Sequence, residues 1–281
     1  MGLSTEEILQ LSLDLVGWDD VPGDSTVYVP GTDIETALVG IDLNSPEVQL
    51  AHREGYDLAL AHHPAGGDAR LNFGQVLDTQ IEFMVDHGVP EDRAASAIKD
   101  LRRNVAHTAH ASNYRHDPSV AELISQPYMN VHLAPDELGR RAFVNVIDEL
   151  PADATVSDLK VAFGDAFPEI RTAKTDVETR VGRDDNQLGT VAVHHAAGTN
   201  GGASVARAYF DHGVDTVLYI HVGGSDTKEL QEAYGDEKNL IVTGHIASDA
   251  IGMNVFIDAL EEKGVACTTI SGAGIGRHPG E

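Results

Sequence analysis

Apolar residues follow two different periods along this chain, and each change of period marks a predicted element. Ser4 and Glu7 have the spacing of a capping box, and the helical apolar pattern from Ile8 to Val16 predicts a first helix that ends near Gly17. Apolar runs over 36–43 and 56–61 predict strands, and the segment 46–54 between them predicts a helix. A strand–helix–strand unit normally closes with parallel strands, so we expect an α/β fold.

A second unit of the same kind is predicted farther along the chain. Residues 190–193 and 216–220 read as strands, with a helix over 203–212 between them. Glycine, aspartate and histidine occur at the same offsets in both units, at Gly55, Asp57 and His63 in the first and Gly213, Asp215 and His221 in the second. The pattern predicts two similar α/β lobes.

The boundary between the lobes is expected in a proline-containing stretch. Residues 125–185 read as a connection with its own short helix over 156–163, and a strand over 240–243, a helix over 247–263 and a strand over 265–270 follow. We therefore predict a first lobe over residues 1–125, and a connection with a second lobe over residues 126–281.

Histidines gather where predicted strands end. His62 and His63 directly follow the apolar run 58–61, and ligands of open α/β sheets bind beyond the carboxyl ends of the strands. Adjacent residues at a strand end point to opposite sides, so this pair is expected to serve two metals, or one metal and a substrate.

Two further segments combine histidine with aspartate. His245 and Asp249 are four residues apart at the predicted start of a helix, a spacing suited to one cation; the alternative is that Asp249 only complements the helix dipole. His107, His110 and Asp117 belong to a third group, which either completes a metal site or lines a solvated loop.

Charge and cysteine content narrow the classes of function. With 45 acidic and 19 basic residues the net charge is −26, which opposes binding to nucleic-acid phosphates. Such an acidic composition is typical of a halophilic protein, and the alternative is an ordinary acidic protein. The single Cys267 excludes an intramolecular disulfide and a thiolate metal site. No secretory or membrane-spanning segment is recognised, so no membrane partner and a cytoplasmic location are expected.

Taken in order along nearly the whole chain, these motifs resemble the Nif-three-like family, also labelled GTP cyclohydrolase I type 2. The segments that carry the resemblance are Ile41-Asp42-Leu43, Ala61-His62-His63-Pro64, the stretch from His107 to Asn113, the turn near Gly198, and Gly244-His245-x-x-Ser248-Asp249. The resemblance implies two similar α/β lobes with a metal cleft between them, two divalent metal ions, and a hexamer. It also implies that His62, His63, His245 and Asp249 are metal ligands.

Two positions depart from the family pattern. The family's His-Thr-Asn-Leu-Asp has no clean match here, so either His110 substitutes as a ligand, or Asp117 reaches the site, or one metal binds weakly. Asp249 stands where the family has glutamate, which shortens its reach by one methylene.

The function expected from these residues is hydrolysis by a metal-activated water. Imidazole and carboxylate ligands suit zinc, iron, manganese or nickel, and the family label implies a small-molecule substrate such as a nucleotide. The charge of −26 opposes a polyanion such as GTP. His110 or His194 is the expected proton carrier, and specificity is expected in the loops around 65–75 and 110–130. The alternative is a non-catalytic metal-binding or regulatory protein of the same fold.

Overall fold

The computed structural model describes residues 2–277 and divides the chain into two compact units that interleave along the sequence. The first unit comprises Met1–Val76, Asn104–Leu138 and Asp249–Gly274, and the second comprises Leu77–Arg103, Gly139–Ser248 and Ile275–Glu281. The contiguous division expected after residue 125 does not describe this packing. The chain returns to the first unit near its end because its last strand pairs there.

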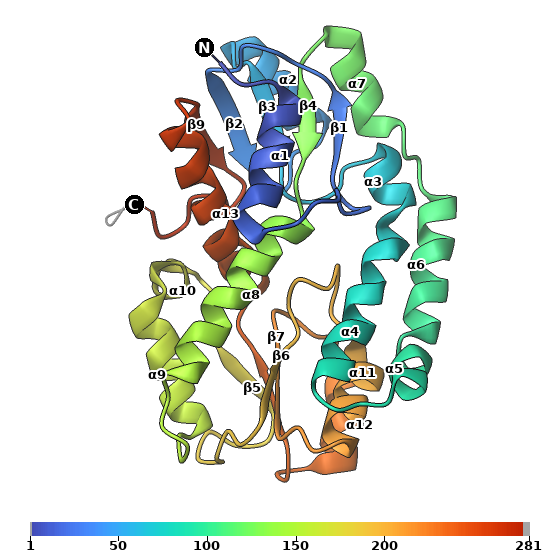
Figure 1. Ribbon diagram of the computed structural model, residues 1–281, viewed down its shortest axis with the longest axis vertical. Coiled ribbons are helices and arrows are strands. Elements are labelled where there is room, and N and C mark those ends of the chain that lie inside the picture. The colour runs from blue at the N-terminus through green and yellow to red at the C-terminus, as the bar shows by residue number, and fades with distance from the viewer. Residues whose placement is uncertain (1, 278–281) are drawn as a thin grey trace. The chain divides into compact units, whose positions relative to one another are not determined.

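The sheet of the first unit has five strands in the order β1-β4-β3-β2-β9 (Figure 1). Their bounds, in chain order, are Thr26–Val29, Thr36–Gly40, Leu58–Ala61, Tyr128–Asn130 and Ala266–Ile270. Strands β2, β3, β4 and β9 run parallel, and β1 pairs antiparallel with β4 at one edge. Every residue of β3 is buried, as expected for a parallel strand covered on both faces.

The sheet of the second unit has four strands in the order β5-β8-β7-β6. Their bounds are Glu178–Val181 for β5, Val191–Val193 for β6, Thr216–Tyr219 for β7 and Asn239–Val242 for β8. Strands β6, β7 and β8 are parallel, and β5 pairs antiparallel with β8 at one edge.

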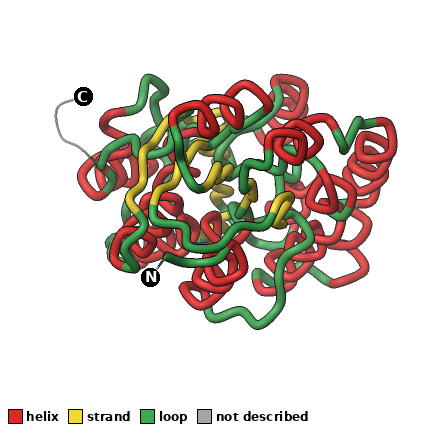
Figure 2. The backbone as a smooth tube through the Cα atoms, turned by 90° about the horizontal axis from the view of Figure 1, so that it is seen from above, coloured by secondary structure: helices red, strands yellow, loops and turns green. Residues whose placement is uncertain are grey.

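Helices connect the strands and lie around them in both units (Figure 2). The α-helices up to residue 124 are α1 Thr5–Val16, α2 Ser45–Glu54, α3 Gly67–Leu71, α4 Asp78–Asp86, α5 Glu91–Ala97, α6 Lys99–Ala111 and α7 His116–Ile124, with the 3-10 helix η1 Phe73–Leu77 before α4. The later ones are α8 Leu133–Asp148, α9 Val156–Ala166, α10 Pro168–Thr172, α11 Gly202–Asp211, α12 Gly224–Tyr234 and α13 His245–Glu262.

The two sheets share a topology, which confirms two similar α/β lobes. In each unit an antiparallel edge strand lies beside a row of parallel strands, four in the first unit and three in the second, and α2 links β2 to β3 as α11 links β6 to β7. The aspartates at matching positions, Asp57 and Asp215, accept backbone hydrogen bonds in both units. Asp57 accepts hydrogen bonds from Thr36 N and Glu35 N at 2.9 and 3.1 Å, and Asp215 accepts one from Thr190 N at 3.0 Å. Each aspartate therefore joins the start of one parallel strand to its neighbour.

Local signals account for the helix ends. Ser4 Oγ accepts a hydrogen bond from Glu7 N, the Glu7 carboxylate accepts one from Ser4 N, and Gly17 ends α1 at φ 76°. This geometry needs a residue that tolerates a left-handed conformation, and glycine does so without strain.

A continuous apolar core lies under one face of the first sheet. Leu38 and Tyr128 of the sheet pack with Val48 and Ala51 of α2 and with Ala121 of α7. This core holds the carboxyl ends of β2, β3 and β4 in a fixed register. Within residues 2–277 we find no helix with both the length and the apolar content needed to cross a lipid bilayer.

Candidate metal centre

Three histidines of the first unit follow the ends of its central parallel strands. His62 and His63 come directly after β3, and His132 follows β4, the neighbour of β3 in the sheet. Beyond the end of β3 the chain stays bonded to the end of β2, since His62 N and His63 N donate to the carbonyls of Gly40 and Ile41, both at 2.9 Å. Because parallel strands end at the same edge of a sheet, the three imidazoles meet there.

The Nδ1 atom of each of these imidazoles forms a hydrogen bond to an acceptor oxygen. His62 Nδ1 donates to the Val131 carbonyl at 3.0 Å, His63 Nδ1 lies 2.8 Å from Asp42 Oδ1, and His132 Nδ1 lies 2.7 Å from Asp24 Oδ2. A carbonyl or carboxylate on Nδ1 fixes the proton there and leaves Nε2 as the metal-binding nitrogen. The pattern is that of metal-ligating histidines, which are oriented through their second nitrogen.

Two buried carboxylates complete the group. Asp136 lies in the first turn of α8 and Asp249 lies in α13, and their side chains are 7% and 1% exposed. His62 Nε2 is 3.2 Å from Asp136 Oδ1 and 3.9 Å from Asp249 Oδ2, and His63 Nε2 is 3.3 Å from Asp249 Oδ2. We call His62, His63, His132, Asp136 and Asp249 the histidine–aspartate cluster.

The residues present fit a bound cation. His62 is fully buried, and its Nε2 forms no hydrogen bond among the described residues although two carboxylate oxygens lie within 4 Å. A lone pair directed at buried carboxylates is unfavourable unless a positive charge lies between them. The ligand atoms of His62, His63 and His132 all lie within 4.8 Å of one another, and so do those of His62, Asp136 and Asp249.

The carboxylates also change how the histidines titrate. Burial lowers the pKa of His132, but the charges of Asp136 and Asp24 outweigh it and raise this pKa to about 9. Burial opposes the protonated form of His63 as well, yet the hydrogen bond to Asp249 and the charge of that carboxylate raise its pKa. Protons therefore balance the buried acids in the metal-free protein, and a cation that binds must displace them.

Of the residues predicted as ligands, the first unit brings together His62, His63 and Asp249. We expected His62 and His63 to point to opposite sides, but their ring centroids are 5.1 Å apart and both Nε2 atoms approach Asp249. The alternation of a strand no longer applies to them because β3 ends at Ala61. His245 is the first residue of α13, one helical turn before Asp249, and stays a predicted ligand.

The third predicted group is placed differently. His110 is exposed on α6, and among the described residues it belongs to no group of side chains close enough to share a metal. Asp117 is buried in α7 and accepts hydrogen bonds from Ser45 N and Ser45 Oγ at 2.8 and 2.6 Å, where it caps the start of α2. Asp117 therefore has a structural task in the first unit.

Sequence reasoning missed His132 and Asp136, which lie in the segment assigned to the connection. Two signals mark them: His132 follows the buried run 128–131, as His62 follows 58–61, and it has the same four-residue spacing to Asp136 as His245 has to Asp249. Pro135 between them obscured the helix start, although proline is tolerated in the first turn of a helix.

The histidines of the second unit lie in other surroundings. His194 follows β6, is 2% exposed, and its Nδ1 lies 3.1 Å from the Tyr209 hydroxyl. Burial lowers its pKa to about 3, with a further contribution from His87 and His195. The rings of His221 and His245 lie 4.7 Å apart, and Asn200 Nδ2 donates to His221 Nδ1 at 3.0 Å.

Comparison with known proteins gives one strong match. No protein-family model matches the chain, and no curated protein does. Among solved structures, a NIF3 superfamily protein from Sphaerobacter thermophilus shares 46% of its residues, with a TM-score of 0.93 over 96% of this chain and 99% of its own.

Two distant structures show the same fold. Reduced HcgD from Methanocaldococcus jannaschii is 13% identical, with a TM-score of 0.59 over 96% of this chain and 99% of its own. The protein TTHA1606 from Thermus thermophilus is 12% identical, with a TM-score of 0.55 over 96% of this chain and 98% of its own. At such low identity the likeness is one of fold alone.

Proposed function

The chain belongs to the NIF3 superfamily, and from this premise we propose that it is a divalent-metal-dependent hydrolase whose metals are held by the histidine–aspartate cluster. A pair of ions is proposed, with His245 as a further ligand one helical turn before Asp249. The ligands are nitrogen and oxygen atoms without thiolate, a set that suits zinc, iron, manganese or nickel.

One observation carries the proposal. Three imidazoles each have Nδ1 held by an acceptor, from Val131, Asp42 and Asp24, and each is left with Nε2 for a cation. Buried carboxylates are costly without a compensating positive charge, and a cation supplies it where Asp136 and Asp249 meet the histidines. A buried histidine with a purely structural role does not require carboxylates near both of its ring nitrogens.

When bound, divalent cations in such a site lower the pKa of a coordinated water and polarise the bond under attack. The chain's own residues prepare the place for this chemistry. Asp42 and Asp24 hold the imidazoles in one orientation, and the burial of His62, Asp136 and Asp249 keeps bulk water from competing. His63, whose side chain is 23% exposed, is the member of the cluster most open to an incoming substrate.

A non-catalytic metal-binding protein is the second candidate. It is favoured by the absence of a clean family aspartate after His107 and by the exposure of His110, which leave the cluster without the ligand expected from that motif. Storage or regulated delivery of a metal requires the ligands but no turnover.

Metal removal and replacement separate the two candidates. Protein treated with a chelator is reloaded with zinc, manganese, iron(II) or nickel, and the metal content and hydrolysis of GTP and of small cyclic amides are measured on the same samples. We expect turnover to follow the metal content and to be lost in Asp249→Asn, a nearly isosteric change. His52→Ala, which removes an exposed imidazole on α2, is the matched control.

Metal binding without hydrolysis of any tested compound would favour the second candidate. Hydrolysis that continues after the metal has been removed would contradict the proposal that the reaction depends on the cluster.

A further inference from the structure

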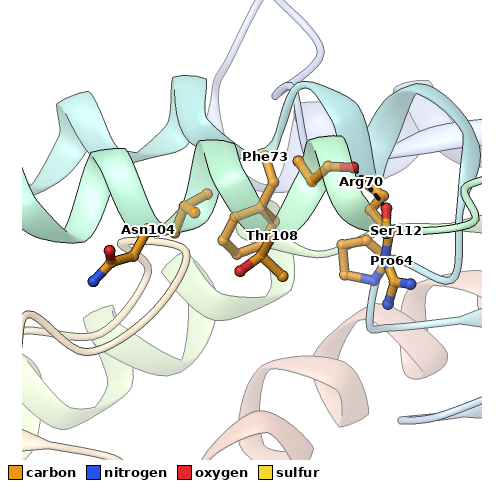
Figure 3. Close-up of a pocket in the computed structure, with 8 residues that line it drawn as sticks. Pro64, Arg70, Phe73, Asn104, Thr108 and Ser112 are labelled. Carbon is orange, nitrogen blue, oxygen red and sulfur yellow. Dashed lines mark hydrogen bonds between the residues drawn. The ribbon is translucent and has the colours of Figure 1, made fainter.

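A pocket of about 380 Å³ opens in the first unit, apart from the five residues of the histidine–aspartate cluster (Figure 3). One wall is the segment that follows β3, and the other is one face of α6. The first wall includes Pro64, Arg70 and Phe73, and the second includes Asn104, Thr108 and Ser112. Asn104 and Thr108 are four residues apart in α6 and therefore lie on the same helical face, and Ser112 directly follows the last residue of α6.

The pocket adjoins the histidine–aspartate cluster. Pro64 is the residue after His63, and the ring of Phe73 lies 5.9 Å from the ring of His132. A molecule packed against Phe73 in this pocket therefore lies close to the His132 imidazole.

Hydrogen bonds hold the first wall in place. The Tyr28 hydroxyl accepts hydrogen bonds from Ala65 N at 3.0 Å and Gly66 N at 3.3 Å and donates to Asn130 Oδ1 at 2.7 Å. A Cβ atom on Gly66 would lie 2.5 Å from the Tyr114 carbonyl, so only glycine allows this approach. These contacts fix the backbone of the first wall next to Pro64.

Arg70 gives the pocket its charge. It lies in α3 and is exposed, and no ion pair or hydrogen bond of its guanidinium is found among the described residues. Several other exposed arginines of this acidic chain have carboxylate partners, as Arg115 has in Glu122 and Arg207 has in Glu229. A guanidinium that lines a pocket without a carboxylate partner is suited to an anion from outside the chain.

The other lining groups define the rest of the ligand. Phe73 and Pro64 offer flat apolar surfaces for a ring, and the hydroxyls of Thr108 and Ser112 and the Asn104 amide offer a few polar contacts. Figure 3 shows Asn104 at one end of the pocket and Arg70 with Pro64 at the other. Ligand pockets usually measure roughly 300–1,000 Å³, so this one suits a compact molecule.

We propose that this pocket binds a small aromatic or heteroaromatic compound with one anionic group, its ring against Phe73 and its anion on Arg70. The anion is a carboxylate or a phosphate. The claim that the pocket binds this compound is independent of the proposed function. The claim that the compound is the substrate of the metal centre rests on the proposed function. A single negative charge also meets less repulsion from a protein of net charge −26 than a polyanion does.

The test measures dissociation constants by ligand-observed NMR on the full chain, with benzoate, phenyl phosphate, the neutral benzamide and the ringless acetate as probes. Metal-loaded and chelator-treated protein are compared, at an ionic strength at which circular dichroism confirms the fold. Arg70→Gln removes the proposed anion contact. Arg93→Gln is the matched control, since Arg93 is an exposed arginine of α5 outside this pocket and its loss changes the net charge equally.

We expect benzoate to bind about tenfold more tightly than benzamide, and Arg70→Gln to remove that difference while leaving benzamide within about twofold. Acetate is expected to bind at least about tenfold more weakly than benzoate to chelator-treated protein, and Arg93→Gln to change nothing. The tighter of benzoate and phenyl phosphate identifies the anion. Equal binding of benzoate and benzamide, an effect of Arg93→Gln as large as that of Arg70→Gln, or no binding of any ring probe would overturn the proposal.

Metal content measured on the same samples keeps the two proposals apart. If metal is bound but Arg70 has no effect, the pocket assignment fails and the proposed function stands. If benzoate binding depends on Arg70 while no metal is bound, the pocket assignment stands and the proposed function fails.

Discussion

His194 makes the stability of the second unit depend on pH in a way that can be calculated. Its imidazole is enclosed by the rings of Tyr209, Tyr219 and Phe83, and burial lowers its pKa to about 3. In the unfolded chain the same group titrates near 6.5. Below that pH the unfolded state takes up a proton that the folded state refuses, so stability falls as the pH drops from 6.5 toward 3.

The size of the effect follows from the two pKa values. At pH 5 the unfolded histidine is protonated and the folded one is neutral, which removes about 2 kcal/mol of the free energy of unfolding relative to pH 8. His194→Gln cannot titrate and keeps a group able to hydrogen-bond the Tyr209 hydroxyl. Whatever the substitution costs at pH 8, we expect the variant to lose about 2 kcal/mol less than wild type between pH 8 and pH 5.

Urea unfolding at fixed salt concentration, followed by circular dichroism at both pH values, measures this difference. Other groups titrate in the same range, so only the comparison with wild type isolates His194, and His52→Gln on the exposed face of α2 serves as the control. NMR titration of the folded protein gives an independent reading, in which the His194 imidazole should stay neutral down to pH 5. Equal pH dependence in wild type and His194→Gln would refute the reasoning.

Three further predictions concern the fold, the charge and the assembly. Asp57→Ala removes the hydrogen bonds that this carboxylate accepts from Glu35 N, Thr36 N and Thr36 Oγ1, and should lower the free energy of unfolding in urea by about 2 kcal/mol. Unchanged stability would contradict the view that Asp57 joins the starts of two strands. The charge of −26 predicts that the thermal midpoint rises as KCl increases from about 0.1 to about 2 M, and a flat response would favour an ordinary acidic protein. The family resemblance predicts a particle of six 30.0 kDa chains by light scattering, and a monomer would contradict it.

The elements that could be predicted are those whose own residues show a capping motif or an apolar run. The capping box of Ser4 and Glu7 located α1, and the apolar runs 36–43 and 56–61 located β2 and β3, although β2 ends at Gly40 and β3 begins at Leu58. The partner of the last strand was not predictable in this way. β9 pairs with β2, Ala266 opposite Thr36, across more than 200 residues, and no local pattern encodes such a pairing.

The candidate site was predicted in part for the same reason. His62 and His63 stand at a strand end whose apolar run is long enough to recognise, and Asp249 belongs to a recognisable motif. His132 follows β4, a strand of only three residues, and was therefore assigned to the connection. His110 was chosen from a motif without a clean match, and the structure exposes it on a helix.

Elemental analysis of the purified protein, in molar salt and after loading with zinc or manganese, tests the histidine–aspartate cluster most directly. We predict close to two metal ions per chain in wild type, as in other two-metal sites, and a clear loss in Asp249→Asn and in Asp136→Asn. His110→Ala and His52→Ala should keep the full content, since both imidazoles are exposed. Wild-type protein that holds no metal after loading, or an Asp136→Asn variant that holds as much as wild type, would contradict the account.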